Sequence, residues 1–170
     1  MGAAVCAANS EQGLLEIRVK DHREAIGDFS RLTLKLGKIA ISPKAGLAIW
    51  QVGWRELPPS LQAIDLTKYT GKESATIFKK SIDAGAFDGI QLKLDGIEGI
   101  VKKTQRPARV KNVLTPIKLQ FSVEPKGKTI IVLDLVVLDM SDHPPRGYEL
   151  GIKGYELYRN GKLVDKVPPG

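Results

Sequence analysis

The sequence predicts an all-β protein, an antiparallel β-sandwich or open barrel of about eight strands, with one short helix near residues 74–82. Apolar and polar residues alternate with a period of two through most of the chain, as they do in half-buried strands. Glycine and proline separate these runs at intervals too short for strand–helix–strand units. With 170 residues, the chain is long enough to bury a core without disulfides or metal.

Three segments in the first half of the chain are predicted strands. Residues 15–20 place leucine, isoleucine and valine on one face and charged residues on the other. Residues 32–42 repeat this pattern, and Gly37 shifts its phase, which indicates a long strand with a bulge. Pro43 ends that strand. Residues 47–54 form a shorter segment that holds both tryptophans.

One segment, residues 73–82, is predicted to be helical. Ser74 is a suitable N-cap, and Ile77, Phe78 and Ile82 fall near one face at helical spacing. The glycine at position 85 would end this helix.

The second half of the chain returns to strand patterns. Residues 87–94 and 117–123 alternate, whereas residues 129–138 are apolar on both faces and are expected at the centre of a sheet. A carboxylate inside that last run, Asp134, requires a hydrogen-bonding or basic partner, and a structural role is favoured for it. The dipeptide Asn160-Gly161 lies between two alternating runs and predicts a β-hairpin.

The predicted organisation has three parts. Residues 1–13 are a signal remnant or a flexible arm, residues 14–154 are the sandwich domain, and residues 155–170 are a C-terminal hairpin extension. No apolar run approaches the ~18 residues of a membrane span, so the protein is not expected to be transmembrane.

The opening residues are small and apolar, like the last part of a secretory signal. Val5 and Ala7 suit the −3 and −1 positions of a cleavage site. Lipid attachment at Cys6 is an alternative, although valine is a poor match for the residue that precedes a lipidated cysteine. A flexible tail is the third interpretation.

The positive charge is concentrated in one stretch. Residues 102–128 contain eight basic residues and one acidic residue, whereas the remaining charges balance, so this stretch carries the whole formal net charge of +7. It is a candidate surface for an anionic partner, such as a membrane or a glycan, or else a solvated face. Nucleic acid is not expected, because only one aromatic residue accompanies the charges. The candidate residues are Lys102, Lys103, Arg106, Arg109 and Lys111.

No catalytic pattern is present, and the protein is not expected to be an enzyme. A single cysteine and two distant histidines, His22 and His143, argue against a metal site, and no cofactor is predicted. The pair Asp21-His22 is interpreted as a solvated turn, because neighbours at a strand end point in different directions.

Aromatic residues indicate candidate protein interfaces. Trp50 and Trp54 are four apart, so on a strand they project from the same face. They suit a protein interface or, as an alternative function, a carbohydrate-binding platform, although burial of at least one of them in the core is favoured. In the hairpin, Tyr155, Leu157 and Tyr158 mix apolar and polar surface as an interface does, and folding of the hairpin onto its own sheet is the alternative.

The order of these segments resembles a prokaryotic family of secreted or envelope domains of unknown function with a transthyretin-like, or carboxypeptidase-regulatory-like, β-sandwich. The similar elements span residues 14–152. Their order carries the resemblance, since no single motif is specific. They are the aspartate turn at Asp21, the broken strand 32–42, Trp54, Asp65-Leu66, the glycine–aromatic segment 85–92, the late hairpin 118–129 and Asp134-Leu135.

Two features depart from the family pattern: His22-Arg23 replaces a small residue and proline, and the C-terminal hairpin is an addition. The resemblance implies a non-catalytic, extracytoplasmic protein of the periplasm, cell envelope or secreted fraction, associated with a membrane in some settings. Such a protein would act as a structural or accessory subunit with protein partners in a larger assembly.

Overall fold

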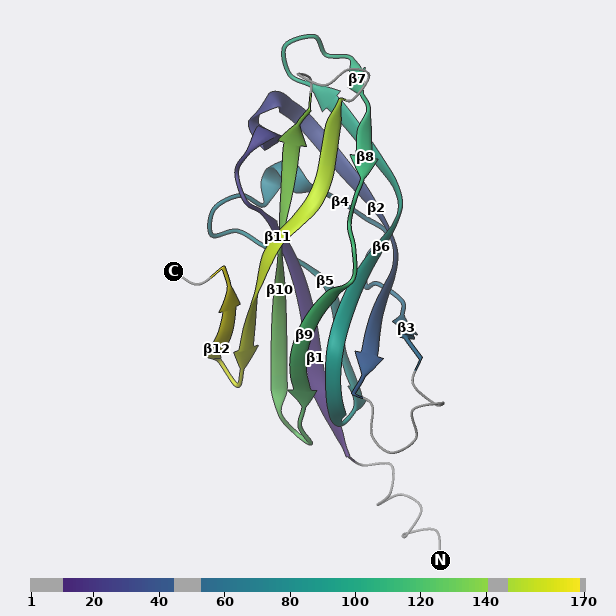
Figure 1. Cartoon of the computed structure of the whole chain (residues 1–170), viewed down its shortest axis with the longest axis vertical. Helices are drawn as coiled ribbons and strands as arrows, with labels where there is room; N and C mark the ends of the chain where they lie inside the picture. The colour runs from purple at the N-terminus through teal and green to yellow at the C-terminus, as the bar shows by residue number, and fades with distance from the viewer. Residues whose placement is uncertain (1–10, 45–52, 141–146, 169–170) are drawn as a thin grey trace, which may run out of the picture.

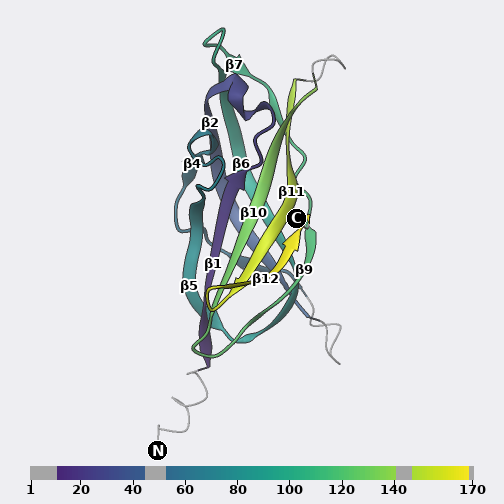
Figure 2. The same cartoon turned by 90° about the vertical axis from the view of Figure 1, so that its left-hand side faces the viewer.

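The fold is a sandwich of two six-stranded β-sheets, which confirms the predicted class (Figure 1; Figure 2). The computed structural model describes residues 11–44, 53–140 and 147–168. Within these ranges there is no α-helix, and the only helical turns are the short 3-10 segments η1 (Ala25–Asp28) and η3 (Leu66–Lys68).

The first sheet has the strand order β12-β11-β10-β1-β5, and β8 pairs with β11. Its strands are β1 (Gln12–Asp21), β5 (Ala75–Asp83), β8 (Val110–Asn112), β10 (Lys128–Asp139), β11 (Tyr148–Arg159) and β12 (Lys162–Val167).

The second sheet has the order β3-β2-β6-β7, with β4 paired to β2 and β9 paired to β6. Its strands are β2 (Phe29–Pro43), β3 (Arg55–Leu57), β4 (Ala63–Asp65), β6 (Gly85–Val101), β7 (Pro107–Ala108) and β9 (Ile117–Val123). The strand count exceeds the predicted eight because β3, β4, β7 and β8 have only two or three residues, too few to show an alternating pattern.

Most strand pairs are antiparallel, as predicted, but β1 pairs with β10 in parallel from Leu14 opposite Lys128 to Asp21 opposite Leu135. β8 and β11 are also parallel. Between β1 and β10 the chain alternates between the two sheets: β2–β4, β6, β7 and β9 belong to the second sheet, whereas β5 and β8 belong to the first. The last crossing, from β9, brings β10 beside β1 in the same direction (Figure 1). This crossover depends on pairing across the whole chain, and local alternation does not reveal it.

The predicted helix at residues 74–82 is wrong, since this segment is strand β5, antiparallel to β1. The register shifts so that Phe78 lies opposite Ile17 and Thr76 opposite Arg18. This β-bulge turns both Ile77 and Phe78 into the core. Two adjacent buried residues break the period of two, and their spacing then resembles that of a helical face.

The predicted C-terminal hairpin is present. Asn160 and Gly161 form its turn with φ values of 50° and 86°, the left-handed conformation that this dipeptide favours. The arm from residue 155 onward belongs to the same strand as residues 148–152, because a register shift opposite Asp134 and Leu135 keeps β11 continuous. The predicted boundary at residue 155 therefore falls inside β11, and β12 completes the sheet.

The core lies between the two sheets and is built from the inward residues of the long strands. In β1 and β10 the apolar inward residues have no more than 1% of their surface exposed, and β2 and β6 of the second sheet contribute further buried apolar residues. The fully buried side chains include Leu15, Ile17, Ile131, Leu32, Leu34, Ile39, Ile41 and Ile90.

We predict that Gly154→Ala will detach β12 from the sheet. A methyl group on Gly154 would overlap the carbonyl oxygen of Val167, so the strand end must move away. The free energy of unfolding should fall by about 1–3 kcal/mol, the usual cost of overpacking, and amide exchange should quicken across β12. Gly85→Ala is the control, because the nearest atoms lie 4.0 Å from its added methyl. Equal effects of the two variants would contradict this account.

Candidate functional site

The outer face of the first sheet carries an ionic network centred on a buried carboxylate. The side chain of Glu16 is only 2% exposed. It accepts hydrogen bonds from Arg18 Nε at 2.5 Å and Thr76 Oγ1 at 3.0 Å, and Lys128 Nζ lies 3.9 Å away. Burial by itself would raise the pKa of Glu16, but the bonds from Arg18 and Thr76 outweigh it and lower the pKa.

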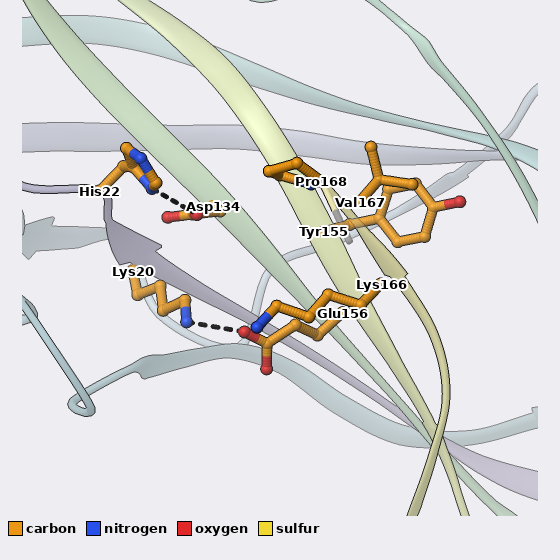
Figure 3. Close-up of a pocket in the computed structure, with 8 residues that line it drawn as sticks. All are labelled: Lys20, His22, Asp134, Tyr155, Glu156, Lys166, Val167 and Pro168. Atoms are coloured by element: carbon orange, nitrogen blue, oxygen red, sulfur yellow. Dashed lines mark hydrogen bonds and ion pairs between the residues drawn. The ribbon is translucent and has the colours of Figure 1, made fainter. Parts of the chain in front are cut away.

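Next to this network lies a cavity of about 290 Å³ between the end of β1 and the end of β12 (Figure 3). Two polar contacts cross it: the ion pair of Lys20 Nζ with Glu156 Oε2 at 2.8 Å, and the hydrogen bond between His22 Nδ1 and Asp134 Oδ2 at 2.9 Å. Val167 and Pro168 border the cavity beside Tyr155. Asp134, predicted to need a partner, finds it in His22, which the sequence did not single out for this role.

The part of this cavity that the structure describes does not assemble a complete nucleophilic triad. A histidine held by an aspartate supplies two members of a nucleophilic triad, but among the described residues no serine, threonine or cysteine lines the cavity. The Tyr155 hydroxyl donates to Asp165 Oδ2 at 2.7 Å. Burial, together with that carboxylate, raises the pKa of Tyr155 to about 12, so its phenol is not an activated nucleophile.

The predicted solvated turn at Asp21 is wrong for this residue, whose side chain points into the protein with 2% exposed. Asp21 is the last residue of the inward row of β1, whereas His22 lies on the outer face of the sheet. One Asp21 oxygen accepts the backbone N–H of Arg23 at 2.5 Å, and the other has no partner among the described residues. Burial raises the pKa of Asp21 to about 6.

The five predicted anion-binding residues lie at one end of the sandwich, which we call the basic end (upper end of Figure 1). The turn after β6 carries Lys102, Lys103 and Arg106. Arg109 lies between β7 and β8, and Lys111 lies in β8. All five are exposed, and none forms an ion pair with a carboxylate in the described part of the chain.

The rest of the basic stretch is elsewhere. Lys126 lies in the turn between β9 and β10 at the opposite end, and Lys128 belongs to the Glu16 network. The structure therefore divides a stretch that is continuous in sequence.

The basic end also holds a cavity of about 630 Å³, which we call the end cavity. Its lining comes from the turn after β1, η1, the start of β2, η3 with the segment that follows it, and the turn after β6. The lining residues are Arg23, Glu24, Ile26, Gly27, Phe29, Ser30, Thr67, Thr70 and Lys102.

The predicted interface residues are dispersed. Trp54 is 43% exposed, and its ring lies against Gly89, while Trp50 lies outside the described residues. Leu157 is 4% exposed and belongs to the core, so it does not contribute to an outward surface. Tyr155 packs partly against the core, and the half-buried Tyr158 donates its hydroxyl to Glu156.

Sequence reasoning missed Arg23, Glu16 and the pair Lys20–Glu156. Glu16 and Lys20 stand in the polar half of an alternating strand, where a solvated side chain is the ordinary expectation. From the sequence, only a carboxylate in an unexpected place, such as Asp134 within an apolar run, indicates that it needs a partner.

Comparison with protein families identifies this chain. The family model described as Domain of unknown function (DUF4382) matches residues 12–150, and the chain belongs to that family. No curated protein and no solved structure matches the chain. Among the described residues, no helix has the length and apolar character needed to cross a membrane.

We predict that Asp21→Asn will remove a pH-dependent part of the stability. The pKa of Asp21 rises from an ordinary 3.8 to about 6 on folding. Between these values the folded protein keeps a proton that the unfolded chain releases, so this carboxyl group lowers stability as pH rises from 4 to 6, by about 3 kcal/mol in total.

Urea unfolding of wild type and variant from pH 3.5 to 8 measures this effect. The stability of wild type relative to the variant should fall between pH 4 and 6 and stay constant above pH 7. Asp83→Asn, at an exposed position, is the control. A difference that does not change with pH would contradict the buried, proton-binding role of Asp21.

Proposed function

We propose that this protein is a non-catalytic, extracytoplasmic structural or accessory subunit of a larger envelope or membrane-associated assembly. Its partner protein would add a strand to the edge of the first sheet at β12. The exposed edge formed by β12 is the observation that carries this proposal, because an unpaired edge offers N–H and C=O groups to a second chain.

All six residues of β12 are exposed, and among the strands of the first sheet it stands last in the order. Three of its large apolar side chains are about half exposed: Leu163 by 51%, Val164 by 49% and Val167 by 42%. Natural proteins blunt such an edge with lysine, and Lys162 begins this strand. A partner strand with apolar residues and a carboxylate opposite Lys162 would complement it.

The remaining parts of the proposal have their own support. In the described part of the chain, the cavity around His22 has no serine, threonine or cysteine that could complete a triad, which supports a non-catalytic role. The prokaryotic origin, the transthyretin-like kinship and the extracytoplasmic location rest on the order of family elements and on the small, apolar residues that open the chain.

A photo-crosslinking amino acid at position 164 tests this proposal in cells of the native host. It should give an adduct of one defined mass, which the same probe at Lys93, on the outer side of the second sheet, should not give. In protein without the probe, Val164→Lys should reduce co-purification of the partner about tenfold, whereas Val164→Thr keeps strand propensity and should retain it.

No adduct at position 164, or equal co-purification of the lysine variant, would contradict docking at β12. Turnover of an ester, glycoside or peptide substrate that His22→Ala abolishes would contradict the non-catalytic part.

Carbohydrate binding at Trp54 is a second candidate function. The indole ring lies against Gly89 and is 43% exposed, which suits stacking on a sugar ring. Soluble glycans should then quench tryptophan fluorescence in wild type, and Trp54→Ala should abolish that response. Unchanged fluorescence at millimolar glycan would exclude this function.

A further inference from the structure

We propose that the end cavity is a binding site for a phosphate group, held by Arg23 and Lys102. The cavity opens within the basic end, between segments that are far apart in sequence. This inference goes beyond the proposed function, because the strand edge at β12 plays no part in it.

The position of Arg23 is built into the fold. Its φ of 62° is in the left-handed region, which is uncommon for a residue with a side chain. The carboxylate of Asp21 accepts the Arg23 backbone N–H at 2.5 Å, and Asp21 itself is fixed by its own N–H, which donates to Tyr69 at 2.8 Å. In this backbone conformation Arg23 lines the end cavity.

A glycine then makes room for the guanidinium group. Gly71 has a φ of 68°, and a Cβ atom at this position would collide with Nη2 of Arg23. The guanidinium therefore lies against bare backbone, where a side chain would push it aside. Among the described residues Arg23 has no carboxylate within ion-pair distance, so its fork of donors is available to a ligand.

Lys102 supplies the second cation from the other sheet. Its backbone N–H donates to the carbonyl of Asp28 at 2.8 Å, which ties the turn after β6 to η1. Gln105 closes this turn with a φ of 56° and donates its side-chain amide to the carbonyl of Lys102 at 2.8 Å. Two independent segments thus bring Arg23 and Lys102 to one cavity.

The number of available donors favours phosphate over a simple carboxylate. Ser30 and Thr67 donate to Ile100 and Asp65, but Thr70 Oγ1 has no partner within the described ranges. Together with a guanidinium fork and an ammonium group, this provides more donors than the two oxygens of a carboxylate need, whereas phosphate offers three or four oxygens. Glu24 also borders the cavity and would disfavour ligands with further negative charge near it.

The surrounding charges strengthen attraction to such a ligand. Lys103, Arg106, Arg109 and Lys111 lie at the same end and are exposed. A concave site surrounded by one sign of charge raises the local concentration of anions, and the effect weakens as salt screens it.

Two probes distinguish the source of the phosphate. Glycerol 3-phosphate, titrated into the ¹⁵N-labelled full chain, tests a soluble phosphate by NMR. Vesicles of phosphatidylglycerol, compared with vesicles of phosphatidylcholine, test a lipid headgroup by sedimentation. Saturable shifts at Arg23, Thr70 and Lys102, or binding confined to the anionic vesicles, would each support the site and identify its ligand class. No binding in either experiment overturns the proposal.

The variants separate this site from general charge attraction. Arg23→Gln should weaken binding about tenfold and Lys102→Gln about threefold to tenfold, as expected for lost charge-assisted hydrogen bonds. Lys80→Gln removes the same charge at an exposed position of β5, opposite Leu15 of β1. This control should change binding less than about twofold.

Arg23→Lys keeps the charge but loses the fork, so it should bind more weakly than wild type and more tightly than Arg23→Gln. Thermal unfolding checks that each variant is folded, and Lys102→Gln decides the question if the Arg23 variants unfold. Equal losses in Lys80→Gln and the site variants would overturn the proposal, since charge alone would then explain binding.

Discussion

The structure depends on strand β1, which pairs with β10 on one edge and β5 on the other. A strand in this position has both edges hydrogen-bonded, its inward face packs in the core, and the buried Glu16 on its outward face needs a polar partner. Its inward residues, Leu15, Ile17 and Val19, have no exposed surface and form the centre of the core. Its outward residues, Glu16, Arg18 and Lys20, form ion pairs instead.

The end of β1 determines the two polar sites. Because successive side chains of a strand point to opposite faces, Asp21 enters the interior and His22 lies on the outer face. Asp21 fixes the backbone of Arg23 and so contributes to the end cavity, whereas His22 pairs with Asp134 beside β12. A change in the register of β1 by one residue would exchange these two directions and dismantle both sites.

The surface is organised by the same topology. The turn after β6 and strand β8 connect the two sheets at the basic end, which gathers cations from residues 102–111 there. The hairpin of β11 and β12 extends the first sheet sideways and leaves an exposed edge. Membership of a family of unknown function adds no activity to these features, so their chemistry is the basis for the proposals made for this protein.

The class of fold, the long strands and the hairpin could be predicted from the sequence, because they follow from local alternation and from the turn chemistry of Asn160-Gly161. The strand conformation of β5 could not be predicted in this way, because it depends on pairing with β1. A bulge there turns Ile77 and Phe78 inward together and hides the alternating pattern of a strand. The parallel pairing of β1 with β10 and the partners of Glu16, Asp21 and Asp134 also depend on the tertiary structure. Local sequence patterns do not reveal contacts between residues more than a hundred positions apart, such as His22 and Asp134. Only the assembly of the complete sheet places these two side chains within hydrogen-bonding distance.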